Sequence, residues 1–227
     1  MCMVERHYKE ARRKIQTSIR FTMVLTIPCA VGMGVLAGPI LKLLYNDPDP
    51  DAVAMAVRMF QVGVVSIVLY AMSTLSNGIL QGINQMRLPV IHSAVALALH
   101  LGALYVLVTK FHIGIYGVIQ ANNLFALLMC LMNGIAIRRH IGYRQELMRT
   151  FIIPGICSGF MGLAVFGLYK LLALFAGNAI STVLSIGVGA CIYGALLLML
   201  RGITKKELLE FPKGKTLYRI ARKFHLM

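Results

Sequence analysis

The sequence predicts an all-α membrane protein: a polytopic bundle of about six transmembrane helices with both termini in the cytoplasm. Three observations predict this class, namely the composition, the length of the apolar blocks and the placement of the basic residues. Of the 227 residues, 58% are hydrophobic and 14% are charged, and the mean hydropathy is +0.75. A soluble core does not account for so apolar a composition, so the helices are expected to lie in lipid.

The apolar residues come in blocks of about twenty or more, the length at which a helix crosses roughly 30 Å of hydrocarbon. In chain order, the predicted spans cover residues 20–44, 54–82, 88–109, 114–137, 151–174 and 179–200. Before them, the basic residues 1–19 are expected to form a helical approach to the membrane.

Basic residues then predict the orientation. All but four of the 23 Lys and Arg residues fall in segments 1–20, 83–88, 138–150 and 201–227. The opposite side keeps few basic residues and holds an acidic loop with Asp47, Asp49 and Asp51. The positive-inside rule therefore places both termini and the basic loops in the cytoplasm. The net charge of +15 is mostly this topology signal. Because no basic face with base-reading groups is visible, nucleic-acid binding is not expected.

The first span contains Pro28 and three glycines before Pro39. A proline inside a span removes one backbone hydrogen bond, so Pro28 favours a kink in this helix. Such a bend suits a protein that rocks between states, although static spans also carry one.

The second span has polar side chains on one helical stripe. Ser66, Tyr70, Ser73, Asn77 and Gln81 are spaced by four, three, four and four residues within an otherwise apolar run. Such a polar seam faces either other helices or a wet cavity. Both interpretations are open, since a seam that only hydrogen-bonds neighbouring helices has the same spacing.

A second seam follows in the fourth span, where Tyr116, Gln120 and Asn123 stand at i, i+4 and i+7, with Asn122 adjacent. Two seams on different helices indicate a shared interior, or equally hydrogen bonds between helices. Arg58 lies about one turn inside the second span. It either snorkels to the interface or lines the outer mouth of a cavity.

The third span carries His92 and His100, eight residues apart and so on roughly one face. His100 falls near mid-membrane, where it either relays protons or hydrogen-bonds a neighbouring helix as a neutral group. Together these positions form the set of candidate substrate-path residues: Arg58, Ser66, Tyr70, Ser73, Asn77, Gln81, His100, Tyr116, Gln120 and Asn123.

No enzyme activity, cofactor or metal site is expected. The spans contain no Asp or Glu, and no phosphate-binding loop, paired carboxylates or metal-ligand cluster appears. The stretch GICSG (155–159) superficially resembles the nucleophile motif of rhomboid-type proteases. Ile156 replaces the motif's glycine, however, and the last span has no histidine to act as a base.

The last two spans carry few polar groups and several glycines, which are expected to let the helices pack closely as a lipid-facing hairpin. These glycines are Gly155, Gly159, Gly162, Gly187, Gly189 and Gly194. Beyond Arg201, basic and apolar residues alternate in the pattern of an amphipathic segment on anionic membrane lipids, with a disordered basic tail as the alternative.

Three stretches make the chain resemble a known family. NGILQGINQMRLPVIHS (77–93) resembles the helix-loop-helix of bacterial polysaccharide and lipid-linked oligosaccharide flippases, of the multidrug/oligosaccharidyl-lipid/polysaccharide exporter superfamily. GITKKELLEFPKGKTLYRIARKF (202–224) resembles the ending of its sporulation-protein and lipid II flippase-like branch, and LAGPILKLLY fits the same pattern. The resemblance extends over essentially the whole chain.

The resemblance implies a fragment, since family members have about fourteen spans in two six-helix lobes plus two added helices. Residues 1–19 would then be a cytoplasmic approach segment, 20–137 four helices of the second lobe and 138–150 a cytoplasmic loop. Residues 151–200 would be the added C-terminal hairpin and 201–227 a basic cytoplasmic tail. The N-terminal lobe, with the cavity arginines implied for the family's lipid II flippases, would be supplied in cis or as a separate chain.

The function that the resemblance implies is a flippase in the bacterial cytoplasmic membrane. It would move lipid-linked oligosaccharide, or peptidoglycan or polysaccharide precursors, by alternating access. The first alternative is a multidrug or cation antiporter of the same superfamily. The second is a non-transporting membrane scaffold in cell-envelope assembly.

Overall fold

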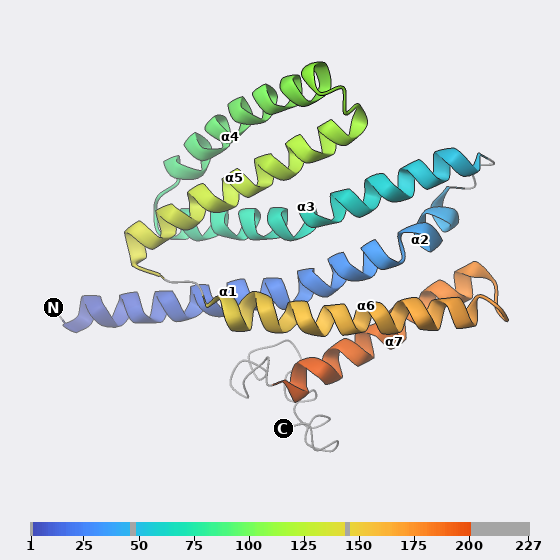
Figure 1. Cartoon of the computed structure of the whole chain (residues 1–227). Coiled ribbons are helices and arrows are strands. Elements are labelled where there is room, and N and C mark those ends of the chain that lie inside the picture. The colour runs from blue at the N-terminus through green and yellow to red at the C-terminus, as the bar shows by residue number, and fades with distance from the viewer. Residues whose placement is uncertain (1, 46–48, 144–145, 201–227) are drawn as a thin grey trace. The chain divides into compact units, whose positions relative to one another are not determined.

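The computed structural model describes residues 2–45, 49–143 and 146–200, and regular structure in those residues is helical, with no strand (Figure 1). Six of these helices are long and apolar enough to cross a membrane. The predicted all-α class and the count of six spans are therefore confirmed. The basic tail from residue 201 onward and Asp47 of the acidic loop lie outside the described residues.

Seven α-helices and two π-helical turns follow one another along the described chain. The helices are α1 (Cys2–Val35), α2 (Ala37–Leu44), α3 (Pro50–Gly82), α4 (Arg87–Tyr105), α5 (Ile115–Ile141), α6 (Ile153–Leu172) and α7 (Asn178–Met199). The turn η1 (Val106–Lys110) extends α4, and the turn η2 (Met148–Ile152) leads into α6. In η1 the i+5 spacing is visible where the Phe111 N–H donates to the Val106 carbonyl at 3.2 Å.

The chain divides into two compact units, and the division cuts α1 between Thr26 and Ile27. The first unit combines residues 1–26 and 49–146, and so contains the N-terminal part of α1 with α3, α4 and α5. The second unit combines residues 27–48 and 147–227, and its described helices are the rest of α1, α2, α6 and α7.

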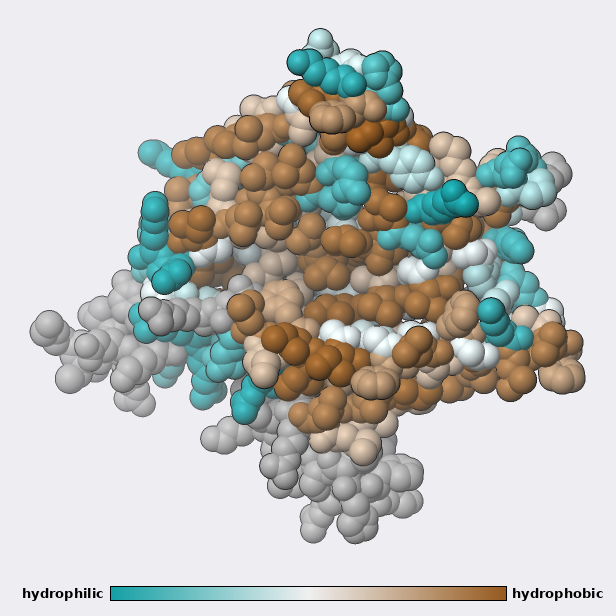
Figure 2. All heavy atoms as spheres, in the orientation of Figure 1, coloured by the Kyte–Doolittle hydropathy of each residue, from teal (hydrophilic) through white to brown (hydrophobic). Residues whose placement is uncertain are grey.

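In the first unit, α5 lies between α3 and α4 (Figure 1). α4 packs mainly on α5 through the buried Ala96, and most of its remaining surface is apolar and exposed. Figure 2 shows hydrophobic side chains over much of the visible surface of the helices. Exposed apolar side chains of this extent are expected where a helix faces lipid.

α3 begins where its sequence predicts a helix start. Asp49 is the N-cap, and its Oδ1 accepts a hydrogen bond from the Asp51 N–H at 3.0 Å. Pro50 follows at the first helical position, where its missing N–H would have had no partner within the helix.

The first span is interrupted at Leu36 and not at Pro28, which lies inside the continuous helix α1. The Leu36 N–H donates to the Gly32 carbonyl, and the next ladder bond joins the Ile40 N–H to the Leu36 carbonyl. Pro39 has no N–H to give the Val35 carbonyl, so the regular ladder fails at this point. The second proline of the span, together with Gly38, therefore explains where α1 gives way to α2.

In the second unit, α6 and α7 form a hairpin whose buried faces are rich in small residues. On α6 these include Ser158 and Gly162, and on α7 they include Ser181, Ser185 and Gly189, each four residues from the next. A Cβ at Gly162 would lie 3.0 Å from Val31 Cγ1 of α1, and one at Gly189 would overlap Val165 Cγ2.

Close packing through glycine is thus confirmed for two of the six glycines and wrong for the other four. A Cβ at Gly155, Gly159, Gly187 or Gly194 would meet nothing within 4 Å. Serines take their place in the contact, because a small side chain of either kind lets two helices approach closely.

Candidate functional site

The polar seam of α3 meets polar residues of α5 within the first unit. Ser66 Oγ donates a hydrogen bond to Asn123 Oδ1, and the Tyr70 hydroxyl donates to Asn122 Oδ1 at 2.6 Å. Asn123 Nδ2 reaches the Val62 carbonyl at 3.5 Å. The two rows that the sequence singled out therefore face each other, and this contact fixes the axial register of α3 against α5.

Ten residues beyond Asn123 along α5, three helices are joined through a single buried amide. Asn133 of α5 is fully buried. Its Nδ2 donates to Asn77 Oδ1 of α3 at 2.7 Å, and its Oδ1 lies 2.8 Å from His92 Nδ1 of α4. Because Asn133 uses its amide nitrogen toward α3, its carbonyl oxygen accepts from His92, whose Nδ1 must then carry a proton.

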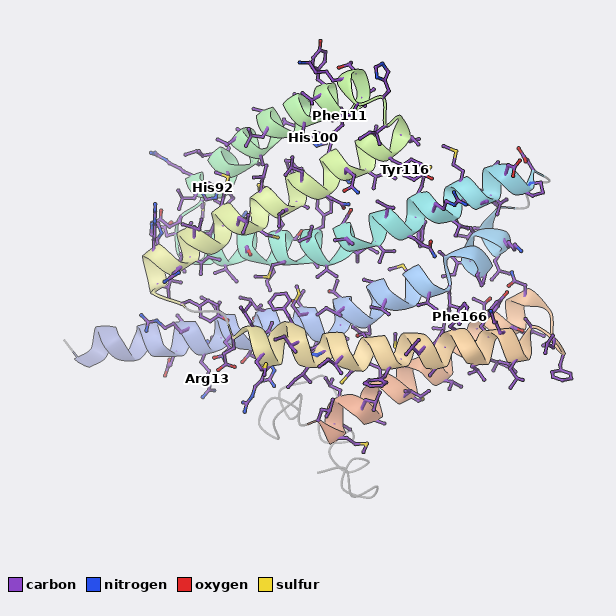
Figure 3. All side chains as sticks on the ribbon, viewed as in Figure 1. Arg13, His92, His100, Phe111, Tyr116 and Phe166 are labelled. Carbon is purple, nitrogen blue, oxygen red and sulfur yellow. The ribbon has the colours of Figure 1, made fainter. Side chains whose placement is uncertain are left out.

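His100 of α4 also bonds to α5. Its Nδ1 lies 2.9 Å from the Ala121 carbonyl, and since a carbonyl only accepts, Nδ1–H is the donor. The Phe125 ring meets the imidazole edge to face, with the centroids 6.0 Å apart. Figure 3 shows His92 and His100 on α4 and Tyr116 near the start of α5. The geometry is that of an interhelical hydrogen bond, while a proton-relay role for His100 stays a prediction.

The other candidates lie apart from these bonded pairs. Ser73 is buried on α3, whereas Arg58 and Gln81 on the same helix are exposed. On α5, Tyr116 is half-buried, and Gln120 is exposed with its Oε1 3.5 Å from Asn123 Nδ2. Arg58, Gln81 and Gln120 therefore lie at the surface of the unit, whereas Ser73 lies inside it.

Sequence reasoning missed Asn133 and gave Asn122 no role of its own. The two amides are eleven residues apart, just over three full turns, so they share one face of α5. This spacing was a usable signal. Asn133 was missed because it is the only polar side chain in the run Leu131–Ala136, with no polar residue one turn away within that run.

The chemistry of this cluster is that of neutral hydrogen bonding. Amides and hydroxyls both donate and accept, whereas no carboxylate takes part, so the cluster offers no negative charge for a cation. Within residues 2–45, 49–143 and 146–200, no group of three or more His, Cys, Asp or Glu side chains is placed to hold a metal ion.

Tyr143 lies just after α5, outside the membrane-spanning segments, and is buried, with a relative exposure of 8%. Its hydroxyl has no hydrogen-bond partner among the described residues. Burial, and then the negative charge of Glu146, raise the pKa of Tyr143 to about 12.

Comparisons with known proteins agree with this architecture. Residues 3–106 match the MatE family. The chain is also 26% identical over 195 residues to the lipid II flippase MurJ of Bacillus subtilis (strain 168), an alignment that covers 82% of the chain. It covers 35% of that relative, so the chain spans about a third of the length of the curated relative that it matches.

No solved structure matches the chain. The two matches that were found confirm the resemblance to the exporter superfamily that the sequence indicated. Taken with the six apolar helices, they identify a multi-pass membrane protein.

Proposed function

Given a chain related to the MatE family, we propose that it forms part of a flippase that moves a lipid-linked sugar precursor across the cell membrane. The observation that carries the proposal is the similarity to a lipid II flippase over 82% of the chain. The polar cluster of α3, α4 and α5 adds physical support, since polar groups within membrane spans mark substrate paths more often than chance.

In this proposal the bonded residues hold the wall of a hydrophilic path, and the exposed polar residues contact the sugar. Asn77, Asn133 and His92 keep three helices in register, and Ser66 with Asn123 does the same nearer the start of α5. The exposed side chains of the set are the candidates for the substrate: Arg58, Gln81 and Gln120. Amide groups suit sugar hydroxyls because both partners donate and accept.

The proposed mechanism is alternating access, in which two lobes rock about a central site. This chain supplies one lobe, and the remaining lobe comes from a longer form of the protein or from a separate chain. Residues 1–19, the loop 138–150 and the tail from residue 201 would face the cytoplasm, where anionic lipids attract basic segments.

Two other functions make different predictions. A multidrug or cation antiporter of the same superfamily would need coupling carboxylates outside this chain, since the spans contain no Asp or Glu. A membrane scaffold would need the hydrogen bonds between α3, α4 and α5 for folding alone, and no solute would cross.

A chimera tests the proposal. The aligned 35% of the Bacillus subtilis lipid II flippase is replaced by this chain, and the purified chimera is reconstituted in vesicles. We expect it to move a fluorescent lipid II analogue across the bilayer, as measured by the fraction of dye that an impermeant quencher reaches.

Two controls make the result decisive. The relative with the same segment deleted should be inactive, and the chimera must insert and remain folded at the level of the intact relative. A folded chimera that moves cationic drugs but no lipid II analogue would favour the antiporter, and one that moves neither would favour the scaffold.

A further inference from the structure

An apolar stripe on α5 ends in a basic corner. Leu127, Leu131, Ile135 and Arg138 are spaced by four, four and three residues, so they share one face of the helix. The three apolar side chains are 41%, 54% and 53% exposed, and Arg138 is exposed as well. This face is therefore not the one that packs α3 and α4, which is lined by buried residues such as Asn133 and Ala136.

A second guanidinium is fixed at the same corner by the end of the helix. Gly142 follows α5 in the left-handed conformation (φ +65°) and lies one turn beyond Arg138. Arg12 of α1 donates from Nε to the Ile141 carbonyl at 2.6 Å. Its Nη2 lies 2.8 Å from the point where a Cβ on Gly142 would stand, so the guanidinium lies directly over the glycine.

This arrangement neutralises the negative end of the α5 dipole and leaves positive charge in surplus. Arg12 caps one of the last carbonyls, as basic groups near a helix C-terminus do. Arg12 as a whole is exposed. His140 is oriented by its own hydrogen bond, Nδ1 to the Ala136 carbonyl at 2.9 Å, and Arg139 is exposed beside it.

Charges near this corner are mostly positive. The acidic residues on the same segments are Glu5 and Glu10 on α1 and Glu146 after α5, and of these Glu10 and Glu146 are exposed. The exposed basic residues on these segments include Arg12, Lys14, Arg138 and Arg139. The described carboxylates Asp49 and Asp51 begin α3, at the end of that helix opposite to the one that leads to α4.

We propose that this corner is a binding site for an anionic phospholipid of the adjoining leaflet. Arg12 and Arg138 bind the phosphodiester, and an acyl chain lies along Leu127, Leu131 and Ile135. A basic group that stands directly above an exposed apolar stripe matches the two halves of a membrane lipid. The site differs from the predicted lipid-binding tail, since every residue of it belongs to the first unit.

Charge favours a lipid over a protein as the occupant of this stripe. A protein lobe packed on the three apolar side chains would need no pair of guanidinium groups at one end. A guanidinium that is held in place, as Arg12 is by the Ile141 carbonyl, matches the geometry of a phosphate group. A packed protein lobe is the outcome that the experiment must separate from a lipid.

The test compares two arginines at the same end of the helices. Arg138→Gln removes a guanidinium from the corner, whereas Arg87→Gln removes one from the start of α4, a different helix from the one that carries the stripe. The full chain is purified in neutral detergent, and retention of phosphatidylglycerol against phosphatidylcholine is measured by native mass spectrometry. One basic residue near a membrane surface contributes about a fivefold preference, so Arg138→Gln should lower selective retention by about fivefold.

Arg87→Gln should leave the preference for phosphatidylglycerol within twofold of the unsubstituted chain. Equal losses in both variants would mean non-specific charge attraction and would overturn the proposal, as would an unchanged preference in Arg138→Gln. A phosphatidylglycerol with a photoreactive acyl chain should label Leu131 or Ile135. Labelling elsewhere, or shielding of both residues by a protein partner, would also overturn it.

Discussion

The two units hold their helices together by different means. In the first unit, polar side chains cross from one helix to the next, as Asn133 does toward both Asn77 and His92. In the hairpin of the second unit, hydroxyls mostly bond within their own helix: Ser158 to the Pro154 carbonyl at 2.6 Å, and Thr182 to the Asn178 carbonyl at 2.7 Å. Contact between α6 and α7 depends instead on small residues.

The first unit is thus held by directional hydrogen bonds between helices, and the hairpin by the complementary shape of its packed surfaces. A hydrogen bond between helices stabilises one register, because sliding the helices breaks the bond and leaves its polar groups without this partner. A seam of small residues gives close van der Waals contact without polar groups in lipid. The first unit therefore has polar groups that a transport path can use, while the hairpin is built to pack.

An exception at the loop end of the second unit supports the distinction. Asn178 accepts from the Tyr169 hydroxyl at 2.9 Å and donates to the Pro39 carbonyl at 3.1 Å. These bonds stand near the helix ends, where Pro39 lies in the first turn of α2 and the loop from α6 leads into α7. Polar side chains thus fix the α2 corner, while the middle of the hairpin is packed by shape.

The largest expected effect comes from enlarging the tightest small residue. In Gly189→Leu, the new side chain would collide with Val165, which lies on the facing helix of the hairpin. Overpacking of this kind costs about 1–3 kcal/mol of the free energy of unfolding, measured by denaturant titration in bicelles. Gly187→Leu is the matched control, because a Cβ there would meet nothing within 4 Å. An equal loss of unfolding free energy in the two variants would contradict the view that the hairpin depends on close packing at Gly189.

Next in size is the loss of the amide that joins three helices. Asn133→Leu removes two hydrogen bonds, each worth about 0.6 kcal/mol in membrane proteins, and leaves Asn77 and His92 without this partner. We therefore expect a loss of about 1–2 kcal/mol in the free energy of unfolding.

A double-mutant cycle between Asn77→Leu and Asn133→Leu separates the bond from the change in side-chain volume. A coupling energy near 0.6 kcal/mol is expected if the bond joins the helices. Purely additive effects of the two substitutions would show that α3 and α5 are held by packing, as α6 and α7 are.

Sequence alone predicted the helices and the faces that carry polar groups, because spans and seams are properties of single segments. It indicated that the two seams share an interior, but it did not predict which residue meets which. Ser66 and Asn123 were both singled out, yet these residues lie 57 positions apart in the chain, and their pairing depends on the register of two helices. The fully buried Asn133 was missed for the same reason, since its partners stand on two other helices.

Local rules also fell short where two residue types do the same task. The prediction for the hairpin named glycines only. Ser158 and Ser185 are also small enough for this packing, so the buried faces contain both glycine and serine. The break between α1 and α2 at Leu36 was not predicted, whereas Pro28 lies inside α1 and a kink there stays a prediction.

A smaller effect is expected at Tyr143, where α5 ends. Its pKa is raised from 10.0 to about 12 by burial and then by the charge of Glu146, so the folded state keeps the proton longer than the unfolded chain. Stability from this group is therefore complete below pH 10 and is lost as the pH rises from 10 to 12, by about 1 kcal/mol at pH 11.

The measurement is the denaturation midpoint of the unsubstituted chain and of Tyr143→Phe between pH 8 and pH 12. Below pH 10 the variant should match or slightly exceed the unsubstituted chain, because the buried hydroxyl it removes has no partner among the described residues. Tyr45→Phe, at an exposed position, is the control. Parallel pH curves for Tyr143→Phe and the unsubstituted chain would contradict the assignment.

The smallest effect is expected at Ser185, in the middle of the hairpin. Its hydroxyl is buried without a hydrogen-bond partner in the described part of the chain. Ser185→Ala should therefore change the free energy of unfolding by less than about 0.5 kcal/mol, or raise it. A clear loss would mean that the hairpin depends on a directional polar contact after all, which would narrow the difference between the two units.

The most direct measurement is the rate at which the chimera with the Bacillus subtilis flippase moves a lipid II analogue when Asn77 and Gln120 are both replaced by leucine. If α3 and α5 line a path for the sugar, the rate should fall more than tenfold while the protein remains folded and inserted. An unchanged rate in the folded double variant would contradict the proposed role of these helices in transport.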